Sequence, residues 1–336
     1  MRKTKRKNRT TRTELRYVFR SVGSDLMKVL FMGTPEFAVP SIKAIENDGH
    51  EICVVFTQPD RPKGRGHRLT ISPVKEYAVN RGYEVLQPEK VSSQTLVDVI
   101  DRTKCDVVVV VAYGQKIPAD VLSIPKYGFV NVHASLLPKY RGAAPIEASI
   151  LNGDHETGIT VMYMGAGMDT GDIGIQESIS IGTQTTGGEL TEALSVLGGK
   201  LIAKFLRLLE EGKAPRIEQD GSKATWASKI RPEDLVIDWS LSVEEILNKI
   251  RAFCPGSPAK SRINETNVKI FRASESLEIF AQRPLPGEAF ADRLGRLTVG
   301  CRDGAVVIEE VQPESKGRMT GEEFVRGRMS SSPRRT

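Results

Sequence analysis

The residues with the clearest chemical potential are Asn131 and His133, which alternate with valine within the segment 129–133. This alternation predicts a strand with one face in a core, so the amide and the imidazole project from the same face. Side chains at positions i and i+2 can both donate hydrogen bonds to one oxygen atom, as the stabilisation of an oxyanion requires. The alternative is that both are ordinary half-buried strand residues, which is the more frequent situation for such a pair.

A carboxylate follows in the glycine-rich segment 162–173. Asp169 lies there among glycines, which allow the backbone of a loop to approach a ligand closely. A nearby carboxylate would favour the protonated form of the His133 imidazole. Asn131, His133 and Asp169 are therefore the candidate residues of one site.

Apolar strands and helical segments alternate along the first part of the chain, as expected if a parallel sheet positions these residues. Residues 107–111 are all valine, which is typical of a central parallel strand buried on both faces. A helix with an apolar stripe is predicted over residues 189–211. Further strands are predicted at residues 29–32, 52–56, 158–162 and 173–181. This alternation indicates a doubly wound, Rossmann-like α/β sheet.

The sequence pattern changes after Gly212. Residues 213–235 contain Pro, Gly and Ser and are predicted to form a linker. A helix is predicted at residues 243–253, and the short β-like runs that follow it indicate a small β-barrel. These runs are residues 268–271, 289–290, 297–299 and 305–311. We therefore divide the chain into a basic extension (1–26), an α/β domain (27–212), the linker (213–235), a C-terminal β domain (236–330) and a tail (331–336).

Length and composition exclude several classes of protein. A chain of 336 residues exceeds the commonest domain size and indicates two domains, and a hydrophobic content of 39% supports packed cores. No apolar run is long enough to cross a bilayer, and four scattered cysteines give neither a disulfide frame nor a zinc site. The turn after Met32 lacks the glycine pattern of a dinucleotide-binding fingerprint. We expect a monomeric, cytoplasmic protein without a membrane segment or a metal.

The positive charge of the chain is concentrated at its beginning. The net charge is +6, but residues 1–26 contain nine Lys and Arg against only Glu14 and Asp25, so the rest is nearly neutral. We expect these residues to form a disordered extension. The alternatives are an organelle-targeting segment, a basic arm for RNA, or a start codon assigned too early, because Met27 opens a strand-like run.

A long polar loop is predicted over residues 57–75. It carries four cations among prolines and glycines, namely Arg61, Lys63, Arg65 and Arg68. Loops of this length are usually functional, and cations beside flexible glycines suit a phosphate or the end of a nucleic acid. The alternative is a solvated charged loop without a binding role.

Several motifs, in this order along the chain, are similar to those of one protein family. They are Gly33-Thr-Pro-Glu-Phe-Ala38, Thr57-Gln-Pro-Asp-Arg-Pro-Lys-Gly-Arg-Gly66, Asn131-Val-His133 with Ser135-Leu-Leu-Pro138, Arg141-Gly-Ala-Ala-Pro145 and Met168-Asp-Thr-Gly-Asp172. On these motifs the chain resembles the folate-dependent formyltransferases over residues 28–329. Within that family it is most similar to the members that act on a transfer RNA.

This resemblance implies a formyl donor, 10-formyltetrahydrofolate, and an acceptor, methionyl initiator tRNA, with no metal. It implies that Asn131 and a protonated His133 stabilise the oxyanion, while Asp169 holds the imidazole and helps to move the proton. It assigns the folate-side wall and the pterin pocket to Ser135, Leu136, Leu137, Pro138, Tyr113 and Gly114.

The resemblance also implies where a tRNA binds. The basic loop with Arg61, Lys63, Arg65 and Arg68 would reach the acceptor arm. The C-terminal domain would be OB-like, a fold often used on nucleic acids.

Two other functions share parts of this pattern. A formyltransferase acting on a sugar amine or on glycinamide ribonucleotide would use the same chemistry, but it would not need the basic loop together with an OB-like domain. An RNA-binding protein with an inactive transferase site would not need Asn131, His133 and Asp169.

Overall fold

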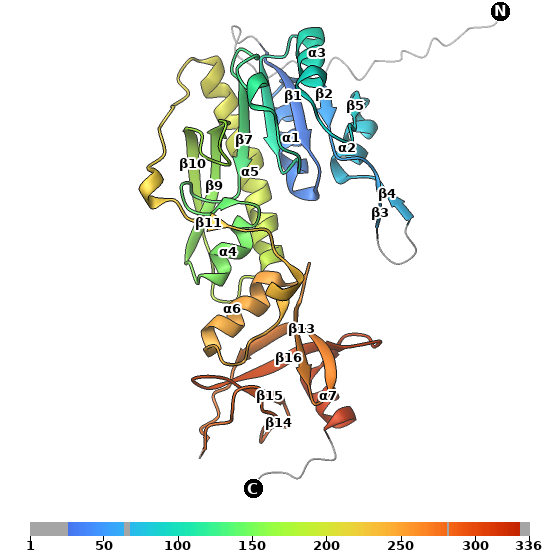
Figure 1. Ribbon diagram of the computed structural model, residues 1–336, viewed down its shortest axis with the longest axis vertical. Coiled ribbons are helices and arrows are strands. Elements are labelled where there is room, and N and C mark those ends of the chain that lie inside the picture. The colour runs from blue at the N-terminus through green and yellow to red at the C-terminus, as the bar shows by residue number, and fades with distance from the viewer. Residues whose placement is uncertain (1–25, 64–67, 281, 330–336) are drawn as a thin grey trace, which may run out of the picture.

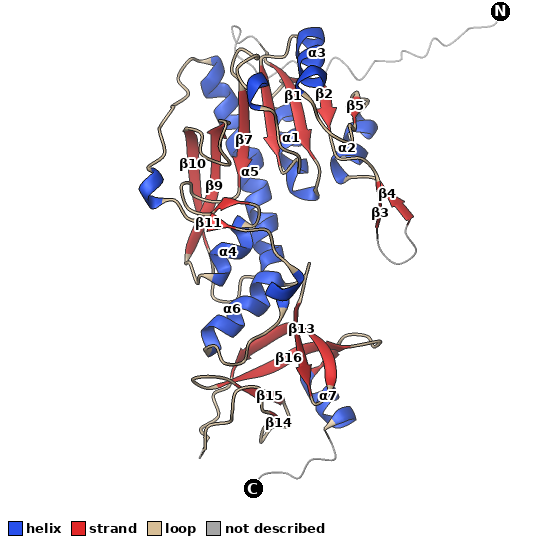
Figure 2. Cartoon of the chain, in the orientation of Figure 1, coloured by secondary structure: helices blue, strands red, loops and turns tan. Residues whose placement is uncertain are grey.

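A computed structural model describes residues 26–63, 68–280 and 282–329 of the chain. Figure 1 shows an α/β part and a smaller β part arranged along the long axis, with helix α6 (Val243–Phe253) between them. Figure 2 shows the same division by secondary structure, with helices flanking the first sheet and strands dominating the second part. Residues 1–25 of the basic extension, Arg65 and the tail lie outside the described residues.

The α/β part is built on a seven-stranded sheet in the order β10-β9-β7-β6-β1-β2-β5. Neighbouring strands from β7 through β6, β1 and β2 to β5 pair parallel, whereas β9 and β10 are added antiparallel. The strands are β1 (Lys28–Gly33), β2 (Glu51–Phe56), β5 (Val85–Leu86), β6 (Val107–Val111), β7 (Phe129–His133), β9 (Glu156–Tyr163) and β10 (Ile173–Ser180). The predicted doubly wound sheet is confirmed, and β6 is buried along its whole length.

Helices cover both faces of this sheet. They are α1 (Val39–Asn47), α2 (Pro73–Arg81), α3 (Ser93–Thr103), α4 (Pro145–Leu151) and α5 (Gly187–Glu210). One apolar core joins the sheet to α1 and α5, and a second core joins its other face to α3. Helix α5 starts at a capping box formed by Thr186 and Glu189. It approaches α1 closely, because a Cβ at Gly199 would lie 2.7 Å from the Pro40 carbonyl oxygen.

The C-terminal part has its own apolar core and a six-stranded antiparallel sheet. Its elements are β12 (Ala259–Ile263), β13 (Thr266–Glu275), β14 (Ala289–Ala291), β15 (Leu297–Gly300), β16 (Ala305–Pro313), β17 (Met319–Thr320) and α7 (Gly321–Arg328). The sheet curls toward a half-barrel, as an OB-like fold does (Figure 1). Helix α6 packs against α4 and α5, and the Gly188 amide donates to the Cys254 carbonyl at 2.9 Å.

Short elements complete the chain. They are the paired strands β3 (Arg61–Lys63) and β4 (Arg68–Thr70), the paired strands β8 (Arg141–Gly142) and β11 (Trp226–Ala227), and the 3₁₀ turns Glu36–Ala38, Ala119–Val121, Gly221–Lys223 and Pro232–Leu235.

The polar segment 57–75 is more ordered than the predicted loop. It contains the β3–β4 hairpin, and α2 already begins at Pro73. Ser72 explains this start, because its hydroxyl accepts the Lys75 amide at 3.1 Å and lies 2.7 Å from the Thr57 hydroxyl. The predicted cations Arg61, Lys63 and Arg68 therefore belong to strands.

Candidate active site

Strand β7 carries Asn131 and His133 to the carboxyl edge of the parallel strands. Its alternate residues Val130 and Val132 point into the core under α1 and α5, so Asn131 and His133 lie on the opposite face. The His133 side chain is only 6% exposed, whereas Asn131 is partly exposed. In open α/β sheets this edge is where ligands bind.

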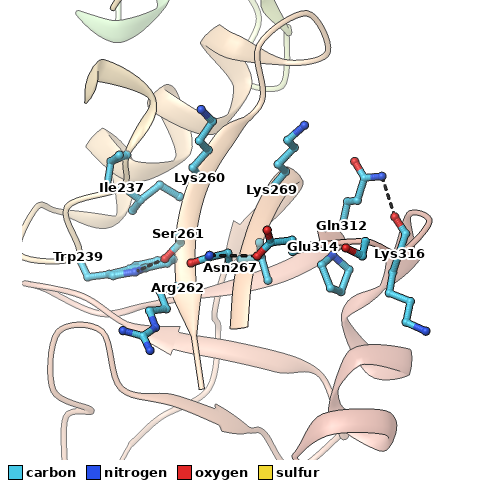
Figure 3. Close-up of a pocket in the computed structure, with 14 residues that line it drawn as sticks. Ile237, Trp239, Lys260, Ser261, Arg262, Asn267, Lys269, Gln312, Glu314 and Lys316 are labelled. Carbon is cyan, nitrogen blue, oxygen red and sulfur yellow. Dashed lines mark hydrogen bonds between the residues drawn. The ribbon is translucent and has the colours of Figure 1, made fainter. Parts of the chain in front are cut away.

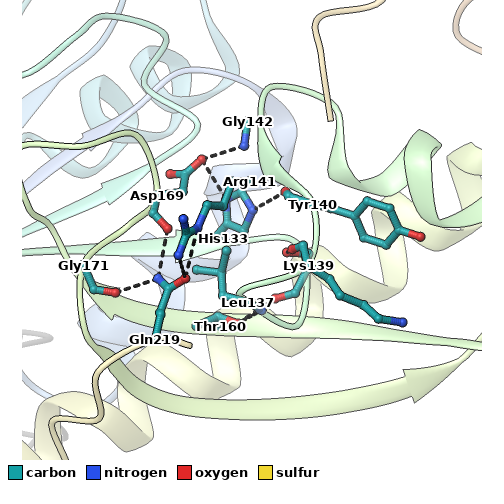
Figure 4. Close-up of polar contacts among 11 residues, drawn as sticks. His133, Leu137, Lys139, Tyr140, Arg141, Gly142, Thr160, Asp169, Gly171 and Gln219 are labelled. Atoms are coloured by element: carbon teal, nitrogen blue, oxygen red, sulfur yellow. Dashed lines mark hydrogen bonds and ion pairs between the residues drawn. The ribbon is translucent and has the colours of Figure 1, made fainter. Parts of the chain in front are cut away.

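The surroundings of His133 fix which ring nitrogen is available (Figure 4). Nε2 lies 3.0 Å from the Tyr140 carbonyl oxygen, which can only accept, so Nε2 carries a proton and donates it to this bond. Nδ1 faces the Asp169 carboxylate with 3.8 Å between Nδ1 and Oδ2, which is too long for a hydrogen bond. Nδ1 is therefore the nitrogen that can exchange hydrogen bonds with a substrate.

Asn131 has an unused amide. Its side chain makes no hydrogen bond to any residue within 26–63, 68–280 or 282–329. When the His133 ring carries a proton on both nitrogens, its Nδ1–H and the Asn131 amide are two donors on the same face of β7, as the stabilisation of an oxyanion requires.

Asp169 is held in a strained loop beside the imidazole. Its φ of +52° is in the left-handed region, which a non-glycine residue adopts rarely. The Gly142 amide donates to Oδ2 at 2.8 Å, and the Gln219 side-chain amide donates to the Asp169 carbonyl at 2.9 Å. Figure 4 shows Asp169 between these two contacts, on the side of His133 opposite Tyr140.

A side chain of β9 makes hydrogen bonds to the backbone of the segment that follows β7. The Thr160 hydroxyl donates to the Ser135 carbonyl at 2.6 Å and accepts the Leu137 amide at 3.0 Å. The Ser135 hydroxyl donates to the Lys139 carbonyl at 2.6 Å. Ser135 and Leu137 are buried, and Leu136 and Pro138 are partly exposed. Of the four predicted folate-side residues, the structure leaves Leu136 and Pro138 accessible.

Tyr140 closes the same segment. Its hydroxyl donates to Asp154 at 2.8 Å while its carbonyl binds His133. Burial, followed by the Asp154 contact, raises the pKa of Tyr140 above its usual range. Tyr140 therefore remains a neutral donor and anchors the imidazole contact.

Tyr113 and Gly114 lie where the strand order reverses, after β6 and beside β1. The Tyr113 carbonyl accepts from the Thr34 hydroxyl at 2.9 Å and from the Gln58 amide at 3.2 Å. The Tyr113 ring is buried in the core over α3, and burial raises the pKa of its hydroxyl to about 12. Gly114 has a φ of +87°, a backbone conformation that glycine adopts without steric strain, and it allows the chain to turn here. The backbone, more than the Tyr113 ring, faces the edge of the sheet.

The site depends on a glycine at position 142. Gly142 has a φ of +120°, and a Cβ there would lie 2.5 Å from the Ala227 carbonyl oxygen of β11. We expect Gly142→Ala to destabilise the fold by about 1–3 kcal/mol and to disturb the Asp169 contact. Thermal unfolding would measure the first effect, and the catalytic rate would measure the second. The control is Gly221→Ala, where a Cβ meets nothing within 4 Å; equal behaviour of the two variants would contradict the prediction.

Three contributors to the site were not predicted from the sequence. Thr160 braces the segment after β7, Gln219 holds the Asp169 loop, and the Thr225 hydroxyl accepts the Tyr140 amide at 2.8 Å. Gln219 and Thr225 belong to the predicted linker, in which a polar residue carries no distinguishing pattern. Only their contacts with distant segments identify them.

The described ranges contain no group of three or more His, Cys, Asp or Glu residues placed to hold a metal ion. In the same ranges, no helix has the length and apolar character that spanning a membrane requires.

Comparison with known protein families matches both parts of the chain. A formyl transferase family model matches residues 27–206, and a model of the formyl transferase C-terminal domain matches residues 229–329. Together these matches cover most of the chain.

Curated relatives and solved structures agree with this match. The chain is 44% identical to the methionyl-tRNA formyltransferase of Symbiobacterium thermophilum over 90% of the chain and 93% of the relative. It is 42% identical to that of Pelotomaculum thermopropionicum, over 90% of the chain and 96% of the relative. An N-formyltransferase from Helicobacter canadensis, solved in complex with folinic acid and dTDP-3-aminofucose, shares the fold at a TM-score of 0.65 and 21% identity, covering 86% of this chain and 100% of that one. A methionyl-tRNA formyltransferase from Clostridium thermocellum aligns at a TM-score of 0.51 and 18% identity, covering 76% and 97%.

Proposed function

The chain belongs to the formyl transferase family, and we propose that it transfers the formyl group of 10-formyltetrahydrofolate to the α-amine of methionyl initiator tRNA. The product is N-formylmethionyl-tRNA, which serves translation initiation. The observation that carries this proposal is the arrangement of Asn131 and His133 beside Asp169. The relatives that are 42–44% identical to the chain are methionyl-tRNA formyltransferases, which agrees with it.

The residues at the sheet edge fit a folate. Asn131 has an unused amide, Leu136 and Pro138 are partly exposed apolar side chains, and the turn at Gly114 lies at the point where the strand order reverses. Folates were bound in solved structures of this fold, including the Helicobacter canadensis enzyme. The folate, when bound, supplies the activated formyl carbon.

The catalytic residues have separable roles. The Asn131 amide and Nδ1–H of a protonated His133 donate to the formyl oxygen, where negative charge develops as the amine attacks. The Tyr140 carbonyl keeps the ring oriented so that Nδ1 faces the reaction. Asp169, with its carboxylate 3.8 Å from Nδ1, favours the charged form of the imidazole and helps to pass the proton from the amine to the leaving nitrogen.

The acceptor arm of the tRNA is assigned to the β3–β4 hairpin because of its cations. Arg61, Lys63 and Arg68 belong to its two strands, and Arg65 in the connection between them lies outside the described residues. The Arg61 guanidinium is well exposed and lies 3.7 Å from Glu89, an ion pair that a phosphate could replace.

A second basic surface lies on the C-terminal sheet (Figure 3). An open groove of about 1020 Å³ has Lys260, Lys269, Arg262 and Lys316 among its lining residues, together with Trp239 and Glu314. Lys260 and Lys269 are paired across β12 and β13 and extend in the same direction. Cations aligned in this way suit a phosphate backbone, so we assign this groove to the body of the tRNA.

Loss of the hairpin cations is expected to weaken use of charged tRNA. The triple variant Arg61→Ala, Lys63→Ala, Arg68→Ala should raise the KM for tRNA about 10-fold, because each phosphate contact releases counterions. The slope of log KM against log salt concentration should fall by about 1 for each phosphate contact that is lost. Binding of folate should not change. Lys200→Ala, an exposed cation on α5, is the control; equal losses for tRNA and folate would place the hairpin in the folate site.

The function itself is tested by single-turnover formylation with labelled 10-formyltetrahydrofolate. Methionyl initiator tRNA and free amino sugars are offered in parallel to the full chain. Transfer to tRNA alone is the expected result. Transfer to an amino sugar, or to neither acceptor, would overturn the proposal.

A further inference from the structure

The segment between the two parts of the chain forms a wall of the catalytic site. Its Ile217 exchanges two backbone hydrogen bonds with Ile173, at 2.7 and 2.9 Å. Arg216 binds the Asp172 carboxylate at 2.7 Å and lies over the Tyr163 ring at 4.5 Å. Further along, β11 pairs with β8 next to Gly142. The segment therefore touches both loops that surround His133.

Gln219 is a buried polar residue of this wall, and both the oxygen and the nitrogen of its side-chain amide make hydrogen bonds. The side-chain oxygen accepts from Arg141, from Nε at 3.2 Å and from a terminal nitrogen at 2.8 Å. The side-chain nitrogen donates to the carbonyl oxygens of Asp169 at 2.9 Å and Gly171 at 2.6 Å (Figure 4). Gln219 and Arg141 are only 9% and 8% exposed.

These contacts define the orientation of the amide. A guanidinium only donates, so the oxygen of Gln219 must face Arg141 and its nitrogen must face the two carbonyls. The carbonyls are those of the tight loop in which Asp169 has a positive φ. A backbone in that conformation persists only where surrounding contacts hold it.

We propose that Gln219 is a positioning residue for catalysis, which transmits the fixed position of Arg141 to the Asp169 loop and so sets the place of the Asp169 carboxylate beside His133. The inference rests on the role of Asp169 in the proposed function. On this inference, the segment between the two parts of the chain belongs to the active site. The Arg141–Gln219 contact links that segment to the residues that follow β7.

Two substitutions separate positioning from general stability. In Gln219→Glu, the carboxylate can still bind Arg141 but cannot donate to the two carbonyls; Gln219→Met loses both contacts. We expect both variants to lower the single-turnover rate 10- to 100-fold, as a displaced catalytic group does, with Kd values for folate and tRNA within about threefold of wild type. Glu218→Gln, an exposed neighbour, is the matched control and should keep the full rate.

The comparison with thermal stability is decisive. Gln219→Glu should unfold at a higher temperature than Gln219→Met because it keeps the Arg141 contact, yet it should be no faster. If the rates instead follow the unfolding temperatures, Gln219 has a structural role only and the proposal is wrong.

A double substitution tests whether Gln219 acts through Asp169. In an Asp169→Ala background, Gln219→Met should lower the single-turnover rate by less than about threefold further, because the carboxylate that Gln219 positions is already absent. A further loss of 10-fold or more would overturn the proposal.

Hydrogen–deuterium exchange supplies a readout that does not depend on activity. Exchange of the peptide 164–173 should be faster in Gln219→Met than in Glu218→Gln, and equal exchange would contradict the proposed contact. If the wild-type chain forms no formylmethionyl-tRNA, the proposed function fails. If the wild-type enzyme is active and both Gln219 variants transfer the formyl group as fast as it does, this inference is wrong while the proposed function stands.

Discussion

His133→Ala is expected to lower the single-turnover rate of formyl transfer at least about 10³-fold while leaving tRNA binding nearly unchanged. The loss of one oxyanion donor alone costs about 3 to 4 kcal/mol, and the imidazole beside which Asp169 acts is lost with it. The measurement is the rate with saturating methionyl initiator tRNA, accompanied by a tRNA-binding titration.

A second variant excludes damage to the fold as the cause. The His133 ring is buried and its Nε2–H satisfies the Tyr140 carbonyl, so alanine leaves a buried acceptor unpaired. In His133→Gln, the longer amide can still donate to Tyr140 but offers nothing at the position of Nδ1. We expect His133→Gln to be more stable than His133→Ala and nearly as inactive.

The control for both variants is His155→Ala, which removes an exposed imidazole after α4. It should keep the wild-type rate. A normal rate in His133→Ala, or a loss in His155→Ala of similar size, would refute the assigned role of His133.

Asp169→Asn is expected to lower the same rate about 10²-fold. An asparagine oxygen can still accept the Gly142 amide, which binds Oδ2 at 2.8 Å in the wild type, so the loop keeps its main side-chain contact. What disappears is the negative charge 3.8 Å from Nδ1 and the capacity to take part in proton transfer. The rate at substrate saturation should fall with little change in either binding constant.

The matched control is Asp172→Asn, in the same loop. Asp172 is partly exposed and binds the Arg216 side chain, which is 65% exposed, and no hydrogen bond or ion pair joins Asp172 to His133 among the described residues. Its loss should change the rate less than about threefold, as expected for an exposed ion pair. An Asp169→Asn enzyme that keeps the wild-type rate would show that the carboxylate has no catalytic part.

The strands, the helices and the two-part architecture could be predicted from the sequence because they depend on local patterns. The valines of β6, the alternation of β7 and the apolar stripe of α5 each follow from the burial of neighbouring positions. The same alternation placed Asn131 and His133 on one face. The β3–β4 hairpin was missed because its polar residues resemble those of a loop.

The working geometry of the site was decided by tertiary contacts alone. Which imidazole nitrogen faces the substrate depends on the Tyr140 carbonyl, seven residues away and in a different segment. The position of Asp169 depends on Gly142 and on Gln219, which is 50 residues further along the chain. None of these three contacts follows from a periodic sequence pattern, because hydrogen bonds between distant segments form only after the sheet has brought those segments together. The sequence by itself therefore determined the fold and the residue types at the candidate site, and the tertiary structure decided the orientation and the support of those side chains.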